Sequence, residues 1–266
     1  MTTPVSPPHR SAPQPATALL LAALLNACTP LAPPPIPVPA AAISPAKPSV
    51  PTPPSNAAHA DMDATTQAPY QHARQLGQQV LSIAPGRSLI AVTVRRGGAF
   101  ARFGHDHVVA SRAISGLVAP AAGLADFSFR LDQLTVDEAE LRIQAALDTQ
   151  PGADAIAGTR HNMLVKVLDA ERYPLVKVHV ERGAAANADA DADADAPLAV
   201  SITLHGVSRT LSIPVRIERE RNTLRATGTV RFKQSDFGIV PYSLMGGALA
   251  VQDQLELRFD LVALAP

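Results

Sequence analysis

The feature that most constrains this chain is a period of two in its apolar residues, which recurs between residues 87 and 263. Val176, Val178 and Val180, for example, alternate with polar residues. Such alternation is typical of antiparallel strands that keep one face dry and the other face in water. The pattern predicts eight or nine strands, over residues 87–95, 107–118, 124–132, 139–147, 174–182, 198–205, 210–218, 223–234 and 251–263.

Two segments interrupt this alternation. Residues 154–170 place apolar side chains at roughly helical spacing, which predicts one or two short helices before Pro174. The alternating Ala-Asp run at 188–195 has no apolar side chain large enough to bury, and it predicts a solvated hairpin loop. An antiparallel sheet of this size closes into a barrel or stacks as a sandwich, and the strand pattern alone does not choose between the two.

The N-terminal part of the chain has a different composition. Residues 1–70 contain 17 of the 25 prolines and almost no aromatic residue, so they cannot form a packed core. We expect a signal peptide over residues 1–27, a Pro/Ala-rich disordered tether over 28–79, and one folded domain over 80–266.

The signal-peptide prediction depends on Ala16–Ala27, a mostly apolar run that is too short to span a bilayer. The run ends in Leu25-Asn26-Ala27-Cys28, which resembles the lipobox of bacterial lipoproteins, although Asn26 departs from the small or β-branched residue usual there. The sequence therefore predicts that Cys28 is lipidated and anchors the protein to a membrane of the bacterial cell envelope, in the periplasm. Ordinary secretion and an unprocessed cytosolic chain are the alternatives.

The charge balance argues against nucleic acid as a partner. The chain has 23 Lys and Arg against 23 Asp and Glu, a net charge of zero, whereas proteins that bind duplexes carry a strong basic surface. Cys28 is the only cysteine, so the sequence excludes an internal disulfide and a cysteine-based zinc site.

Two histidines stand two residues apart. On a strand, His105 and His107 point to the same face, a geometry that can bind zinc or copper, and His161 is a candidate third ligand. Such a site would suggest a metal-dependent hydrolase or lyase. The alternatives are a polar cluster that fixes the turn at Gly104, or contact with the head group of a bound molecule.

Four motifs, taken in their order and spacing, resemble the YceI family of polyisoprenoid-binding periplasmic proteins. They are Phe103-Gly104-His105-Asp106-His107; Arg160-His161-Asn162-Met163-Leu164, followed by Leu168–Pro174; Leu204–Arg209; and Gln234–Ile239, followed by Pro241-Tyr242-Ser243. The resemblance covers about residues 85–263. It implies an all-β fold, an antiparallel eight-stranded barrel similar to the lipocalins, with one or two short helices.

The resemblance also implies a function. The barrel would hold an apolar-tailed molecule such as a polyisoprenoid, a quinone or a fatty-acid-like amphiphile, for carriage or sequestration, without catalysis, cofactor or metal. The expected ligand contacts are Phe103, His105, His107, Phe127, Phe129, His161, Leu164, Phe232, Phe237, Ile239 and Tyr242. Ile143 and Leu257 are further candidates for the wall, and Leu244 and Met245 for the mouth. Besides the hydrolase or lyase using His105 and His107, a scaffold for envelope stress or protein interaction is an alternative.

Overall fold

The alternating segments form a closed antiparallel barrel in the computed structural model, which describes residues 64–182 and 196–266. The expected signal peptide, Cys28 and the Ala-Asp run at 188–195 lie outside the described residues. Eight strands pair in a ring, and the last of them pairs back with the first. In ring order they are β1 (Leu81–Ile83), β5 (Ile114–Ala119), β6 (Leu124–Arg130), β8 (Leu175–Glu181), β9 (Ala196–Leu204), β10 (Val207–Glu220), β11 (Thr223–Lys233) and β14 (Gln254–Leu264).

The ring of hydrogen-bonded strands is complete at one end of the barrel, which we call the closed end. It is interrupted at the other end, which we call the divided end. Strand β14 pairs with β1 at the closed end and with β2 (Leu89–Val94) toward the divided end. Strand β2 pairs in turn with β4 (His107–Ser111), and β4 pairs with β7 (Thr135–Val136). Fully buried Ser88 bridges the interruption between β1 and β2: its hydroxyl donates to the Val262 carbonyl and accepts from the Val262 amide. Since β7 has no pairing with β8, the sheet is open between them at this end.

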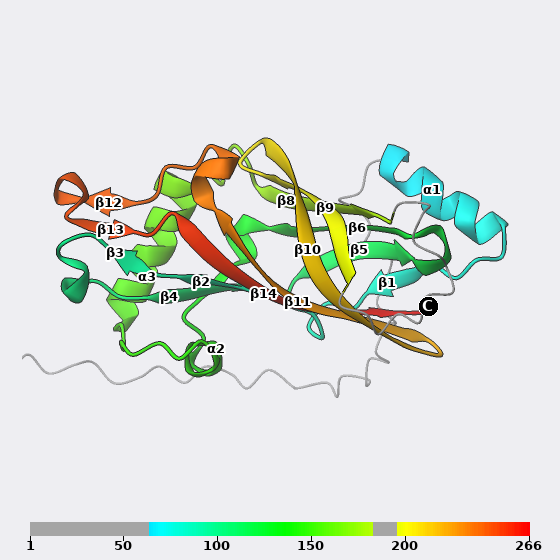
Figure 1. The fold of residues 1–266 in the computed structure, drawn as a ribbon, viewed down its shortest axis with the longest axis horizontal. Coiled ribbons are helices and arrows are strands. Elements are labelled where there is room, and N and C mark those ends of the chain that lie inside the picture. The colour runs from blue at the N-terminus through cyan, green and yellow to red at the C-terminus, as the bar shows by residue number, and fades with distance from the viewer. Residues whose placement is uncertain (1–63, 183–195) are drawn as a thin grey trace, which may run out of the picture. The chain divides into compact units, whose positions relative to one another are not determined.

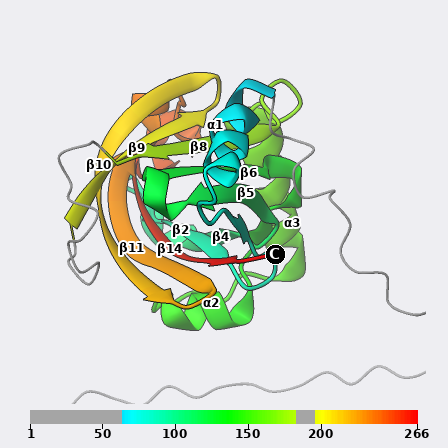
Figure 2. The same cartoon turned by 90° about the vertical axis from the view of Figure 1, so that its right-hand side faces the viewer.

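The helices cover different faces of this barrel (Figures 1 and 2). Helix α3 (Ala153–Asn162) continues as a π-helical turn, Met163–Val167, and contacts β7 beside the opening, which confirms the helix expected from the spacing at 154–170. Helix α1 (Ala64–Gln75) lies at the closed end, where Tyr70 and Ala73 pack on Leu117 and Ala119. Burial raises the pKa of the Tyr70 phenol, which donates a 2.7 Å hydrogen bond to Asp126.

Two differences from the sequence-based expectations concern helices. Helix α1 falls inside the segment 28–79 that the composition predicts to be a disordered tether, and this helix is held by Tyr70, which is completely buried against the barrel. The strand expected at 139–147 is wrong, since Ala139–Gln144 forms helix α2. Leu141 packs against Ala91, Val108 and Ala110 on the outer face of β2 and β4.

A second, three-stranded sheet stands at the divided end. It consists of β12 (Ser243–Leu244), β13 (Leu249–Val251) and β3 (Arg96–Gly97). Inside the barrel, Phe127, Phe129 and Phe259 pack against both of the main core clusters and so fill the middle of the barrel. No helix within residues 64–182 and 196–266 is long and apolar enough to cross a bilayer.

Candidate functional site

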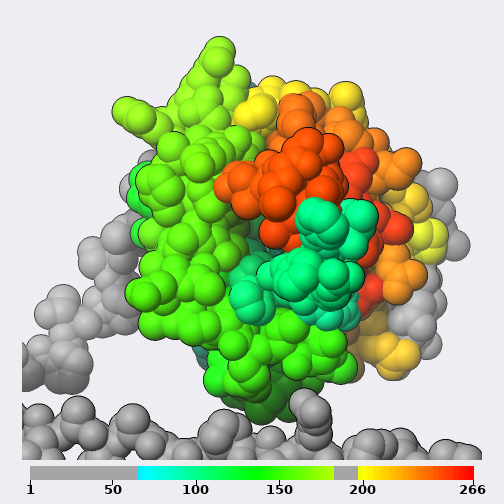
Figure 3. Space-filling view, turned by 90° about the vertical axis from the view of Figure 1, so that its left-hand side faces the viewer, coloured from blue at the N-terminus to red at the C-terminus, as the bar shows by residue number. Residues whose placement is uncertain are grey.

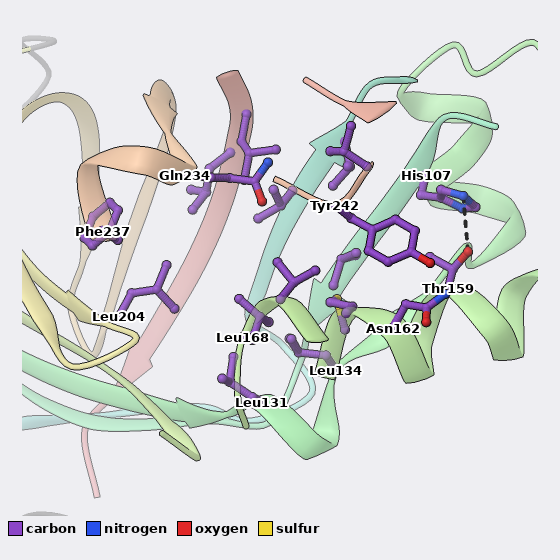
Figure 4. A pocket seen from close by; sticks show the side chains of 18 of the residues that line it. His107, Leu131, Leu134, Thr159, Asn162, Leu168, Leu204, Gln234, Phe237 and Tyr242 are labelled. Carbon is purple, nitrogen blue, oxygen red and sulfur yellow. Dashed lines mark hydrogen bonds between the residues drawn. The ribbon is translucent and has the colours of Figure 1, made fainter. Parts of the chain in front are cut away.

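A cavity of about 370 Å³ occupies the divided end of the barrel. Its wall is mainly apolar and comes from the inward faces of the strands, from α3 and from the π-helical turn (Figure 4). Val92 and Val94 on β2, Val109 on β4, and Leu255 and Leu257 on β14 follow the alternation of their strands. The cavity lies where β2, β4 and β7 extend the sheet from β14 and the sheet is open between β7 and β8.

The polar end of this cavity is built around His107. Its Nδ1 lies 2.6 Å from a carboxylate oxygen of Asp137, and its Nε2 lies 3.3 Å from the Thr159 hydroxyl (Figure 4). An ionised carboxylate only accepts hydrogen bonds, so Nδ1 carries the hydrogen and Nε2 is directed to Thr159 at the cavity. Asn162 lines the cavity beside Thr159, and the Tyr242 hydroxyl points toward this pair.

Asp137 holds the imidazole in place because several groups hold its own carboxylate. The carboxylate is fully buried, accepts a 3.0 Å hydrogen bond from the Val108 amide and forms a 2.5 Å ion pair with Arg142. Burial alone would raise the pKa of Asp137, but the hydrogen bonds from His107 and the Val108 amide outweigh burial and lower the pKa below its ordinary value. Arg142 also donates to the carbonyls of Asp106 and Thr149.

A second carboxylate fixes the segment between β2 and β4. Asp106 accepts hydrogen bonds from the Arg96 amide at 2.8 Å and from Arg95 at 3.0 Å. Burial opposes ionisation of Asp106, but these donors lower its pKa overall. Arg96 lines the cavity and also pairs with Asp148, so its charge is compensated. The cavity thus has a polar end in which the nearest charges are paired.

Polar side chains also lie along the wall, among them Ser111 and Gln234. Ser111 is buried, lines the cavity, and its hydroxyl has no hydrogen-bond partner among the described residues. His107 and Ser111 are four residues apart on β4, which corresponds to roughly 13 Å along a strand. An unsatisfied buried hydroxyl is costly, and a bound molecule or an ordered water would satisfy it.

The closed end contains a smaller cavity of about 120 Å³, lined by side chains that include Ile83, Val118 and Leu124. Phe127 lines this smaller cavity, whereas Phe129 lines the larger one. The two aromatic residues thus contribute to different spaces.

The structure brings together most of the residues singled out in the sequence. The main cavity is lined by Phe103, His105, His107, Phe129, Phe232, Phe237 and Tyr242, and also by Leu244 and Leu257. Three lie outside both linings: His161 is exposed, Leu164 packs on the core, and Ile239 is buried.

Ile143 is the clear error among the suggested wall residues. It is 79% exposed, because residue 143 is on helix α2 and points away from the barrel. Met245, suggested for the mouth, is exposed and does not line the cavity.

The polar end also contains residues that the sequence reasoning missed. The sequence patterns do not indicate Thr159, Asn162, Asp137 or Arg142 as site residues, and Asp137 is 30 residues from its partner His107. The motif Arg160-His161-Asn162 indicated the correct helix but directed attention to His161 rather than to Asn162. The rings of His105 and His107 are 6.1 Å apart between centroids, and in the described part of the chain no group of three or more His, Cys, Asp and Glu residues is arranged to hold a metal ion.

Comparisons with known proteins identify the family and the fold. A family model described as a YceI-like domain matches residues 90–263. Among solved structures, a polyisoprenoid-binding domain from Saccharophagus degradans, implicated in plant cell wall breakdown, has 15% sequence identity and a TM-score of 0.50, and the alignment covers 71% of this chain and 99% of that one.

Two further structures have lower TM-scores. BcnA from Burkholderia cenocepacia has 15% identity and a TM-score of 0.42, with 68% of this chain and 98% of that chain covered. A Campylobacter jejuni YceI protein has 14% identity and a TM-score of 0.38, with 57% and 81% covered. The comparison with curated proteins gave no match.

Proposed function

This chain belongs to the YceI-like domain family, and from that premise we propose that its barrel binds one apolar-tailed small molecule in the main cavity, without catalysing a reaction. The observation that carries the proposal is the cavity itself: about 370 Å³ of mainly apolar space with one polar end. Ligand sites commonly combine an apolar wall with a few placed polar groups. The similar domain from Saccharophagus degradans is described as polyisoprenoid-binding, which supports an isoprenoid or a related amphiphile as the ligand here.

The apolar wall would supply most of the binding free energy. Each methylene group transferred from water is worth roughly 0.8 kcal/mol, so about ten buried carbons contribute on the order of 8 kcal/mol before the costs of ordering and association. The head group would lie at His107, Thr159 and Asn162, where Asp137 fixes the orientation of the imidazole. This division of roles requires no catalytic group.

We further propose that the protein acts in the bacterial cell envelope and is held at a membrane through lipidated Cys28. The support is the apolar run before Cys28 and the proline-rich segment after it. In that location the barrel would carry or sequester a lipid that is poorly soluble in water.

The binding proposal is tested by filling each of the two cavities in turn. Val92 lines the main cavity and Val118 lines the smaller one, and both are partly buried strand residues. Delipidated protein is titrated with farnesol, with the displacement of N-phenyl-1-naphthylamine as the readout. We expect Val92→Phe to weaken farnesol binding at least tenfold, since the added ring occupies the space of several methylene groups, and Val118→Phe to bind as the unsubstituted protein does.

Native mass spectrometry of the protein as purified from bacteria supplies a second measurement. We expect a bound lipid in the unsubstituted protein and in Val118→Phe, and its loss in Val92→Phe. Equal farnesol affinity in all three proteins, or a preparation that never carries or accepts an apolar ligand, would contradict the proposal.

A further inference from the structure

Exposed apolar side chains gather at the divided end of the barrel. Of the eight large apolar residues that are exposed in the described part of the chain, four lie there: Phe100 (39% exposed), Phe103 (65%), Leu244 (46%) and Met245 (71%). They belong to residues 98–106, between β3 and β4, and to residues 243–248, which are β12 and the turn after it; we call these segments the two loops. We call these four residues the rim. Exposed single apolar residues are ordinary, but a group of four at one place marks an interaction surface.

The rim is a built structure, since the two loops are held to each other. The Phe100 amide donates a 2.7 Å hydrogen bond to the Ala248 carbonyl, and β13 pairs with β3 through Ala250 and Gly97. At Gly98 a Cβ atom would lie 2.6 Å from the Gly247 carbonyl, so the backbones approach too closely for a side chain. The rings of Phe100 and Phe103 pack edge to face, with centroids 6.1 Å apart.

The rim is continuous with the wall of the main cavity. Phe103 and Leu244 are exposed to solvent and also line the cavity. At these two residues the apolar surface of the cavity therefore continues to the outside of the molecule. Figure 3 looks at this end: helix α3 lies on one side and the two loops lie on the other, with a recess between them. A molecule that leaves the cavity here meets the rim first.

Cationic groups stand beside two aromatic rings at this end, exposed Phe103 and half-buried Tyr242. The Arg102 guanidinium lies 4.5 Å from the centroid of the Phe103 ring, and the Lys166 ammonium lies 5.8 Å from that of Tyr242. Within residues 64–182 and 196–266 neither cation forms an ion pair with a carboxylate. Aromatic and apolar side chains flanked by uncompensated cations suit the surface of an anionic lipid bilayer, where rings enter the interfacial region and cations meet the head groups.

We propose that the rim docks on an anionic lipid bilayer and places the mouth of the cavity against the lipid. Docking itself depends on the rim and on the cations Arg102 and Lys166 beside it. Its use for exchanging ligand between bilayer and cavity rests on the function proposed above. The route avoids exposing an apolar tail to water, which would cost roughly 0.8 kcal/mol for each methylene group.

The chain contains no tryptophan, so one introduced Trp reports its own surroundings. Phe100 belongs to the rim but does not line the cavity, and Phe100→Trp exchanges one aromatic ring for another. Ile143→Trp on α2 and Leu76→Trp after α1 are matched controls at exposed apolar positions away from the rim. The full-length proteins are mixed with vesicles of phosphatidylcholine and phosphatidylglycerol, with and without brominated phosphatidylcholine as a quencher.

We expect the emission of Phe100→Trp alone to shift to shorter wavelength and to be quenched by the brominated lipid. Adding Arg102→Gln and Lys166→Gln to this reporter should weaken its response to anionic vesicles by about fivefold for each cation and leave the response to pure phosphatidylcholine unchanged. Every protein carries the same N-terminal segment, and Leu76 lies closer to it in the sequence than Phe100 does. A response of Phe100→Trp that Leu76→Trp and Ile143→Trp do not share therefore reports contact at the rim rather than binding through that segment.

Three outcomes would overturn the docking proposal. The first is no response of Phe100→Trp, and the second is an equal response of all three reporters, which would show general adsorption. The third is a shift of Phe100→Trp that depends on protein concentration in the absence of vesicles, which would show that a second copy of the chain covers the rim. Farnesol binding in solution is measured on the same proteins, so a failure of docking is distinguished from a failure of ligand binding.

Discussion

Asp137 shows how a single residue can organise one end of a cavity. Its backbone has φ of +59°, in the left-handed region that aspartate tolerates better than most residues. The carboxylate then reaches His107, the Val108 amide and Arg142 together. The orientation of the cavity-facing imidazole is therefore fixed by a residue that does not itself line the cavity.

The first prediction concerns this carboxylate. Asp137→Asn keeps the shape and the tolerance for positive φ but removes the charge, so Arg142 loses its buried counter-ion. We expect the free energy of unfolding at neutral pH to fall by about 3 kcal/mol, as for other broken buried pairs. Asp260→Asn is the control: it breaks an exposed pair with Arg225, for which we expect a loss below about 1 kcal/mol.

The pH dependence of the same variant has a defined sign. The pKa of Asp137 is lower in the folded state than its ordinary value of 3.8, so its stabilising contribution is complete above that value and is lost as the pH falls through the folded-state pKa. The difference in unfolding free energy between the unsubstituted protein and Asp137→Asn should therefore shrink on acidification. Urea unfolding at a series of pH values measures it, and a difference that grows in acid would refute the assigned role.

At the residue scale the sequence indicated part of the site. The motif Phe103–His107 predicted three side chains that line the cavity. A family motif identifies such positions even when the residues that contact them are not known. Asp137 and Arg142 were missed, since nothing in the sequence near them shows that they pair with a histidine 30 residues away. Partners of this kind are determined by the strand register, in particular the pairing of β4 with β7.

At the scale of elements, the period of two predicted most barrel strands but misassigned one helix. Residues 139–145 read Ala-Glu-Leu-Arg-Ile-Gln-Ala, which alternates apolar and polar residues as a strand does. Most of these residues are good helix formers, however, and the helix buries Leu141 and Arg142 while leaving Ile143 in solvent. Helical propensity and the ion pair with Asp137 together outweigh the alternation.

Two glycines give opposite predictions for the elements that contain them. Gly116 on β5 is paired with Phe127 on β6, and a Cβ atom at 116 would collide with the Asp126 carbonyl and the Phe127 Cβ. Gly158 is on an exposed part of α3 with nothing within 4 Å of an added Cβ. We expect Gly116→Ala to destabilise the protein by about 2 kcal/mol through overpacking.

Gly158→Ala should instead stabilise the protein by about 1 kcal/mol through helix propensity. Urea unfolding followed by far-ultraviolet circular dichroism measures both variants. A stability of Gly116→Ala equal to that of the unsubstituted protein would show that β5 and β6 can separate, contrary to the packing described here.

At the scale of the whole molecule, the barrel topology followed from the sequence only with the help of a family resemblance. Alternation alone left a sandwich and a barrel open, and the pairing of β1 with β14 decides between them. The division of the interior into two cavities was not foreseen. It coincides with three aromatic residues of β6 and β14, Phe127, Phe129 and Phe259, that pack against both core clusters.

A prediction at this scale concerns membrane attachment. We expect the unsubstituted chain, expressed in bacteria, to fractionate with membranes and to incorporate labelled fatty acid at Cys28, since acyl chains and a second contact give stable anchoring. Cys28→Ala should abolish the label and release the protein to the soluble fraction. Partitioning that is the same in both proteins would refute lipidation, and Cys28→Ala combined with Phe100→Ser would then test whether the rim alone retains the protein.

Helix α1 begins at Ala64, at the closed end of the barrel and remote from the rim. With a lipid on Cys28, the 35 residues 29–63 separate anchor and helix. Their contour length is at most about 120 Å, whereas an eleven-residue strand such as β14 is about 36 Å long. The segment 29–63 is therefore long enough for an anchored barrel to turn its rim toward the same bilayer. The rim would then face the bilayer at an effective concentration near the millimolar range. A single encounter of the rim with the bilayer therefore need not be tight for the rim to meet the bilayer repeatedly.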